Sequence, residues 1–186
     1  MRLFVAINFS QSIRDRIWEA TGSLRNEAFP VRWVDPQLLH LTIKFVGSVR
    51  PDHVPALKTA VTGLASRTCR FSMSITGVGG FPTPKEPHTI WLGCEGVPTL
   101  ELLQHDVERE CAALGFPLEG RPFRPHITLG RVRKGTARRQ LQGIDREMER
   151  VDLSIVAHVS SVELMASKLN SSRPTYHVVH SQDLAR

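Results

Sequence analysis

The sequence predicts an α+β fold with antiparallel or mixed β-sheets. Three observations support this class: some β-rich segments follow one another as hairpins, others are separated by amphipathic helical stretches, and one strand motif occurs twice. The chain has 186 residues, which is enough for one domain with a sizeable shared core. Hydrophobic residues make up 41% and charged residues 23%, as is ordinary for a folded globular protein.

The first half of the chain alternates strands and helices. Ser10 or Ser12 can cap the first helix, Pro36 follows Asp35 in a turn, and Pro51 suits the first position of the second helix. The expected elements are a strand over 3–9, a helix from residue 10 or 12 to about 26, strands over 31–34 and 40–47, and a helix from residue 51.

The second half contains more strands. Gly79 to Pro84 is interpreted as the loop of a hairpin, and Gly115 ends a helix. The last loop contains Asn170, Ser171, Ser172 and Pro174. The expected elements are strands over 71–78 and 88–94, a helix over 99–114, a strand over 123–132, a short helix within 133–150, and strands over 151–156, 158–167 and 176–180.

Charge and cysteine content restrict the cellular location and the binding partners that we expect. The net charge of +6 favours a polyanion such as nucleic acid, a nucleotide or anionic lipid. Cys69, Cys94 and Cys111 lack C-x-x-C spacing and are interpreted as buried, reduced thiols. No segment approaches the roughly 20 apolar residues that span a bilayer, and the first residues lack a signal-peptide pattern. We expect a cytoplasmic protein with no membrane partner.

The repeated motif is His40-Leu41-Thr42-Ile43, which returns as His126-Ile127-Thr128-Leu129. Side chains alternate across a strand, so the His and Thr of each copy share one face and the aliphatic residues share the other. The aliphatic residues can pack into a core. Two copies that face each other across a cleft, one in each lobe, would present two imidazoles and two hydroxyls to one ligand.

This set of groups suits phosphodiester hydrolysis. The reaction needs a base to deprotonate water and an acid to protonate the leaving oxygen. An unperturbed histidine titrates near pH 6.5, so one imidazole can be neutral while another is charged. Threonine hydroxyls can donate hydrogen bonds to the non-bridging oxygens as negative charge develops.

Other interpretations of the motif remain. The histidines could be structural, or they could bind zinc with His88, His105 or His158, but no H-E-x-x-H or Cys/His cluster is present. G-x-S-x-G, a P-loop and G-x-G-x-x-G are absent as well. The sequence therefore favours acid–base chemistry without a metal.

At these residues and their flanks, the sequence resembles the two-histidine (2H) phosphoesterase superfamily. Within it, the chain looks like the bacterial and archaeal RNA 2′,3′-cyclic phosphodiesterases, long called 2′-5′ RNA ligases. Gly130 is a small departure, since Ala is common before the Arg. The matching flanks are Lys44-Phe45-Val46-Gly47, Phe123-Arg124-Pro125, Gly130-Arg131, and the segments 2–7, 164–169 and 174–176.

The resemblance implies a bilobal fold with pseudo-twofold symmetry, in which two sheets flanked by helices surround a central cleft. It implies one domain over residues 1–186, with two intertwined lobes that each carry one motif. The implied reaction opens a terminal RNA 2′,3′-cyclic phosphate to a 2′-phosphate, with no metal and no cofactor. By analogy His40 is the proton donor, His126 is the proton acceptor, and Thr42 and Thr128 hold the phosphate.

Four neighbours are weaker candidates for binding substrate. Lys44 and Arg124 share strand parity with the motif histidines, and each could either neutralise phosphate charge or be solvated at the rim of the cleft. Arg131 has the opposite parity to His126 unless a bulge intervenes, but the family places an Arg there. Phe123 could stack on a base.

Further side chains near the motifs have a structural interpretation. Phe9 and Phe45 could also stack on a base, but they are assigned to the core. The basic run from Arg131 to Arg139 could contact an RNA backbone or form a solvated surface.

Two other functions stay open at this point. The first is a related enzyme activity, either 2′-5′ ligation of RNA or hydrolysis of small cyclic nucleotides or ADP-ribose cyclic phosphates. The second is RNA binding by a module without catalytic activity. The expected partners are RNA ends or nucleotides with a cyclic phosphate, and the chain is expected to be a monomer.

Overall fold

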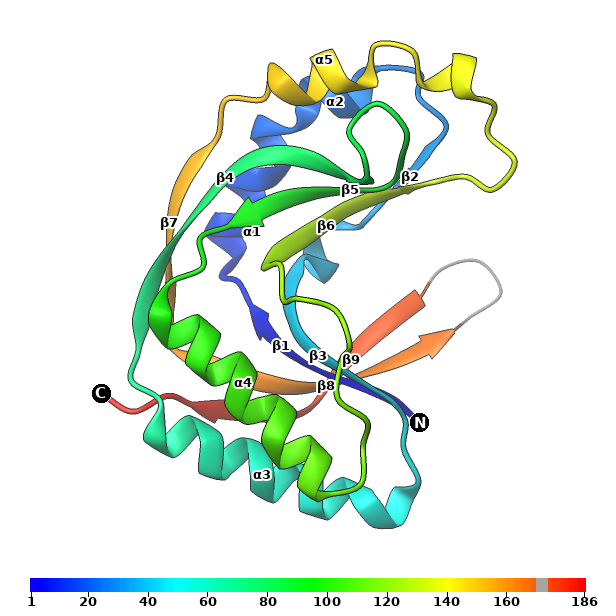
Figure 1. The fold of residues 1–186 in the computed structure, drawn as a ribbon. Helices are drawn as coiled ribbons and strands as arrows, with labels where there is room; N and C mark the ends of the chain where they lie inside the picture. The colour runs from blue at the N-terminus through cyan, green and yellow to red at the C-terminus, as the bar shows by residue number, and fades with distance from the viewer. Residues whose placement is uncertain (170–173) are drawn as a thin grey trace.

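The computed structural model describes residues 1–169 and 174–186, and within these ranges nine strands form one sheet (Figure 1). Its order is β7-β4-β5-β6-β3-β1-β8-β9, with β2 paired to β6, and these strand pairs are antiparallel. The α+β class is confirmed. The two expected sheets are joined into one where β3 meets β6. The predicted loop residues Asn170, Ser171 and Ser172 lie outside the described residues.

The elements follow the predicted order closely. The strands are β1 (Arg2–Asn8), β2 (Val31–Trp33), β3 (His40–Ser48), β4 (Phe71–Pro82), β5 (Pro87–Cys94), β6 (His126–Val132), β7 (Ser154–Val159), β8 (Ser161–Leu169) and β9 (Pro174–Asp183). The helices are α1 (Gln11–Ala20), α2 (Gly22–Asn26), α3 (Val54–Arg67), α4 (Pro98–Ala113) and α5 (Ile144–Glu149), with short 3-10 helices η1 (Pro36–Leu38), η2 (Pro51–His53) and η3 (Arg138–Leu141).

The helices lie on the outside of the curved sheet (Figure 1). Helices α3 and α4 pack against each other, α3 also packs on β8 and β9, and α4 on β3. Helix α5 packs on β4, and α2 packs on α5. Leu57, Val61 and Leu64 recur at helical spacing on α3 and are buried, as the sequence pattern predicts. These helices therefore pack on one face of the sheet, against the main core.

The predicted hairpin loop begins too early. Gly79 and Gly80 lie within β4, and the turn comprises residues 83–86. A Cβ atom on Gly79 would lie 2.4 Å from the ring of Trp91 on the neighbouring strand, so glycine lets that ring lie across the strand. Gly79, interpreted as a loop residue, is thus a place where β4 makes room for an aromatic side chain, whereas a Cβ atom on Gly80 would meet Pro87 at 2.7 Å.

The cysteines are free, as expected, but they are not all buried. Cys111 is buried, Cys94 is half-buried and Cys69 is exposed. Burial raises the pKa of Cys94 to about 12 and that of Cys111 to about 11, so these two thiols stay protonated and unreactive. In the part of the chain that the structure describes, no helix is both long and apolar enough to cross a membrane.

Candidate active site

The two motifs meet where β3 runs antiparallel to β6. Leu41 lies opposite Ile127, and both side chains are fully buried in the main core. In an antiparallel ladder this register sets His40 opposite Thr128 and Thr42 opposite His126. These four side chains are half-buried on the other face of the strands, which are about 4.8 Å apart where they pair. The predicted His/Thr pairs therefore lie together on one face.

Both imidazoles are held in the same way by the backbone. Nδ1 of His40 lies 2.7 Å from the carbonyl oxygen of Leu38, and Nδ1 of His126 lies 2.6 Å from that of Arg124. A carbonyl oxygen can only accept, so each Nδ1 carries the proton and donates it. In each ring this leaves Nε2 as the atom that gives or takes a proton.

Aromatic side chains surround His40. The ring of Phe4 lies 5.0 Å from the imidazole centroid in a tilted arrangement, and Tyr176 lies edge-on at 5.3 Å. Phe4 is buried, and with Ala6, Met165 and Tyr176 it forms a small apolar cluster apart from the main core. This cluster restricts the rotation of the imidazole and removes much of its hydration.

His126 is enclosed in a similar manner by the other half of the sheet. Phe81 lies edge-on to its imidazole with ring centroids 5.1 Å apart, and Trp91 lies at 6.3 Å. Phe81 and Trp91 themselves pack at 5.0 Å. Each histidine thus has a backbone partner on Nδ1 and two aromatic neighbours.

The pKa of His40 is lowered from its ordinary value of 6.5. Burial is the largest cause, because it disfavours the charged imidazolium. The hydrogen bond to Leu38 opposes this shift, while the positive charges of Arg14 and His126 add to it. The charge of one imidazole, that of His126, thus affects the pKa of the other, His40.

A β-bulge in β3 overturns one predicted substrate contact. Thr42 pairs with Ala6 but Lys44 pairs with the preceding residue, Val5, so Ile43 is the extra residue. The side chain of Lys44 therefore turns to the helical side of the sheet. There its Nζ lies 2.6 Å from Glu108 on α4 in a buried ion pair. The prediction that Lys44 faces the phosphate was wrong.

A second bulge, in β6, has the opposite result. Thr128 pairs with Trp91 and Gly130 pairs with Ile90, so Leu129 is the extra residue. Arg131 then shares the face of Thr128, where its Nη1 lies 3.3 Å from the hydroxyl of Thr89. The bulge that the sequence argument required for Arg131 is present.

The remaining candidates lie around this face in different ways. Arg124 precedes β6 and is exposed, and its described contact with the site is through its carbonyl oxygen. Phe123 is half-buried against the main core. Phe9 is buried as predicted, but Phe45 is 66% exposed, so its assignment to the core was wrong. Its ring centroid lies 6.1 Å from that of Phe4, beside His40.

Arg14 is a cation near the site that sequence reasoning missed. Arg14 lies on α1, is half-buried, and donates from Nη1 to the carbonyl oxygen of Gln37 at 3.0 Å. Its charge acts on His40 across the fold. An arginine within an amphipathic helix gives no sequence signal for this position.

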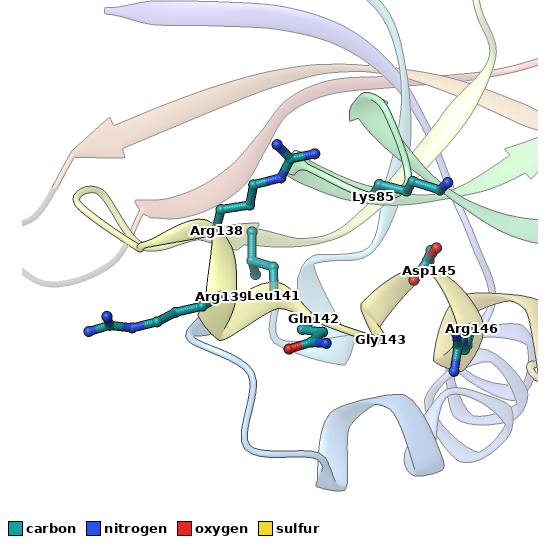
Figure 2. Close-up of a pocket in the computed structure, with 8 residues that line it drawn as sticks. All are labelled: Lys85, Arg138, Arg139, Leu141, Gln142, Gly143, Asp145 and Arg146. Carbon is teal, nitrogen blue, oxygen red and sulfur yellow. The ribbon is translucent and has the colours of Figure 1, made fainter.

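The basic run after β6 borders a separate hollow. A cavity of about 510 Å³ lies between the η3–α5 segment and the tip of the β4–β5 hairpin, and neither motif histidine lines it. Figure 2 shows the side chains that line it. Arg138 and Arg139 line it from one side and Lys85 from the hairpin.

Within residues 1–169 and 174–186, no three His, Cys, Asp or Glu side chains form a group that could hold a metal ion.

Comparison with known proteins agrees with this geometry. The chain matches the 2′-5′ RNA ligase superfamily over residues 13–170. The RNA 2′,3′-cyclic phosphodiesterase of Methanothermobacter thermautotrophicus is 31% identical over 176 residues, which cover 95% of each chain. That of Aeropyrum pernix is 31% identical over 166 residues, 89% of this chain and 93% of the relative.

A solved structure shares the fold. The crystal structure of TT0787 of Thermus thermophilus aligns with a TM-score of 0.83 and 25% identity, over 99% of this chain and 98% of that one. The fold and the facing motifs define an α+β protein with paired H-x-T strands. The chain belongs to the 2′-5′ RNA ligase superfamily, as the resemblance of its motifs predicts.

Proposed function

We propose that this protein hydrolyses the 2′,3′-cyclic phosphate at an RNA end to a 2′-phosphate, using two histidines. The observation that supports this most is the register of Leu41 with Ile127, which puts two imidazoles and two threonines on one face. Each imidazole is held by a hydrogen bond from Nδ1 to a backbone carbonyl oxygen. The relatives named above are RNA 2′,3′-cyclic phosphodiesterases. Residues 1–186 would then be one domain with two intertwined lobes.

In this mechanism His126 is the base and His40 is the acid. Nε2 of neutral His126 removes a proton from water, and the water oxygen bonds to phosphorus. The bond from phosphorus to O3′ breaks, and Nε2–H of protonated His40 delivers its proton to O3′. The product has a 2′-phosphate and a free 3′-hydroxyl, and the next cycle begins after each imidazole returns to its starting form.

The threonines would bind the non-bridging oxygens. Among the described residues, neither Thr42 nor Thr128 uses its hydroxyl in a hydrogen bond to protein, so both can donate to a ligand. The two hydroxyls would stabilise the negative charge that develops on the phosphate in the transition state. Arg131, about 7 Å further along the same face, would add positive potential to the site without contacting this phosphate.

The acid role of His40 requires the charged imidazole, although burial lowers its pKa. A bound cyclic phosphate carries a negative charge, and a nearby anion favours the protonated form. Substrate binding would therefore raise the pKa of His40 and supply the proton donor when it is needed. In the free protein burial favours the neutral form of the same group, which lessens its repulsion with Arg14 and His126.

The exposed ring of Phe45 supports a nucleotide substrate. It lies on the face of Thr42, because the bulge at Ile43 brings it opposite Phe4. A base that stacks on this ring would have its ribose and phosphate directed toward the histidines. The expectations of a cytoplasmic location and a monomeric state remain predictions beside this proposal.

The decisive experiment uses a short RNA that ends in a 2′,3′-cyclic phosphate. We expect turnover in EDTA, a 2′-phosphate product identified by mass and chromatography, and a loss of more than about 100-fold in either H40A or H126A, consistent with an acid–base contribution of that order. Full activity in both variants would refute the mechanism. Salt-sensitive binding with no product, kept in both variants, would indicate the RNA-binding module instead.

A panel of further substrates separates the related activities. RNA halves, small cyclic nucleotides and ADP-ribose cyclic phosphates are supplied under the same conditions. A higher kcat/KM on one of these than on the RNA end would replace the proposed substrate but keep the site. The RNA end is expected to be the best substrate of the panel.

A further inference from the structure

Arg32 and Arg131 form a like-charged pair across two neighbouring strands. They are directly opposite in the antiparallel pairing of β2 with β6, and both side chains are exposed. Trp33 and Val31 lie on the other side of β2, because a Cβ atom on Gly130 would approach them to 2.8 and 2.7 Å. The two guanidinium groups therefore share the face that also carries Thr128.

No carboxylate balances this pair within residues 1–169 and 174–186. Neither arginine takes part in an ion pair there, and the recorded side-chain contact of Arg131 is the hydroxyl of Thr89. Like charges directly opposite in a sheet are destabilising. An anion bound between the two groups would remove this repulsion and accept hydrogen bonds from both.

The position of the pair suggests which anion it binds. Thr128 and Arg131 are separated by two steps of the ladder once the bulge is counted, which corresponds to about 7 Å. The pair thus lies about one side-chain spacing beyond the H-x-T motif, outside the group of four that would hold the reacting phosphate. A second phosphate of the same strand can reach it while the cyclic end occupies the histidines.

The positive surface continues in the same direction. Beyond the end of β6, the cavity of Figure 2 is lined by Arg138, Arg139 and Arg146, with Lys85 on the hairpin tip. Figure 2 shows Arg138 directed toward the hairpin, where it pairs with Glu86. Cations therefore outnumber acids along this route, as a surface that follows a phosphate backbone requires.

We propose that Arg32 and Arg131 clamp the backbone phosphate on the 5′ side of the terminal nucleotide, and that the RNA strand leaves the site over this pair toward the cavity. Arg32 thereby makes kcat/KM depend on RNA length, because a mononucleoside cyclic phosphate has no phosphate at this position. This inference rests on the proposed function. The substrate is then a strand with a phosphate on the 5′ side of its terminal nucleotide, and not the terminal nucleotide alone.

The test compares two substrates in R32Q: a mononucleoside 2′,3′-cyclic phosphate and a trinucleotide with the same cyclic end. The variant should lower kcat/KM on the trinucleotide by about tenfold, mainly through KM, and the ratio of trinucleotide to mononucleotide kcat/KM should fall with it. R32K, which keeps a point charge but not the bidentate fork, should lie between R32Q and the wild type. R109Q alters an exposed arginine on α4 and should leave the ratio unchanged.

A second measurement keeps this test separate from the proposed function. Binding of a trinucleotide with a 3′-hydroxyl is measured over a salt series, and the slope of log K against log salt should become shallower by about 0.7 in R32Q. An unchanged ratio together with an unchanged slope would overturn the clamp. If the wild type hydrolyses neither substrate, the proposed function fails, and the salt slope still decides whether Arg32 binds a phosphate.

Discussion

Phe45 and Arg131 occupy equivalent positions in the two copies of the motif. Each is the fifth residue after its histidine, and each follows a bulge that returns it to the face of the histidine and threonine. The backbone of the two motifs is thus repeated, while the chemistry at this position differs. One half of the site has an exposed aromatic ring and the other has a guanidinium group. A ligand with a base at one end and phosphates at the other would bind in one orientation.

The role of Phe45 gives the first prediction. F45A should raise KM for a mononucleoside 2′,3′-cyclic phosphate by about five- to tenfold, because stacking of a base on an aromatic ring contributes roughly 1–3 kcal/mol. The free energy of unfolding should hardly change, since the ring is 66% exposed. L102A removes a side chain that is 65% exposed on α4 and serves as the control. Equal KM values for both variants would contradict a stacking role.

The buried ion pair gives the second prediction. Lys44 and Glu108 are joined at 2.6 Å, and Glu108 also accepts from the backbone N–H of Glu119. K44M should lower the free energy of unfolding by about 3 kcal/mol, because it leaves a buried carboxylate without its cation. The double variant K44M/E108L should recover much of this loss in urea denaturation.

The same variants decide whether Lys44 has any part in catalysis. Folded K44M/E108L should keep the kcat/KM of the wild type, since Lys44 lies on the helical side of the sheet, against α4. A loss of more than tenfold in the stable double variant would show that Lys44 acts on the substrate after all.

The strands and the motifs could be predicted from the sequence, but the two bulges could not. Period-two alternation places His40 and Thr42 correctly, and the repeat of the motif predicts that two such faces meet. The bulges at Ile43 and Leu129 depend on pairing with β1 and β5, which is a tertiary property with no local signal. Strand parity therefore misplaced Lys44 and left Arg131 undecided. Arg14 and Arg32 lie outside both motifs, and only the tertiary structure brings them near the site.

Gly130 gives the third prediction. A Cβ atom there would lie 2.7 Å from Val31 and 2.8 Å from Trp33, although Ala resembles the family pattern more closely. G130A should therefore lower the free energy of unfolding by about 1–3 kcal/mol and disturb the pairing of β2 with β6. G120A, where a Cβ atom meets nothing within 4 Å, is the matched control. Stability of G130A equal to that of the wild type would show that β2 can shift freely.

Arg14 gives the fourth prediction, because its charge helps to keep His40 neutral. R14Q should raise the pKa of His40 in the free protein, as measured by histidine NMR titration. The matched control is R16Q, on the same helix, whose Nη2 lies 3.4 Å from the carbonyl oxygen of Ser154 and which is not among the groups that shift His40. Equal titration of His40 in both variants would refute the coupling across α1.

The lowered pKa of His40 also has a consequence for stability. In the unfolded chain this imidazole titrates near 6.5, whereas in the folded protein it takes up its proton only at lower pH. Below about pH 6.5 the unfolded state therefore binds more protons, so this group reduces the free energy of unfolding as the pH falls toward the folded pKa. At pH 8 both states are neutral and the contribution is constant. H40N lacks the titrating group but keeps a donor for the carbonyl oxygen of Leu38. The stability of the wild type relative to H40N, from urea denaturation, should thus be greater at pH 8 than at pH 5, and a difference that does not vary with pH would contradict the lowered pKa.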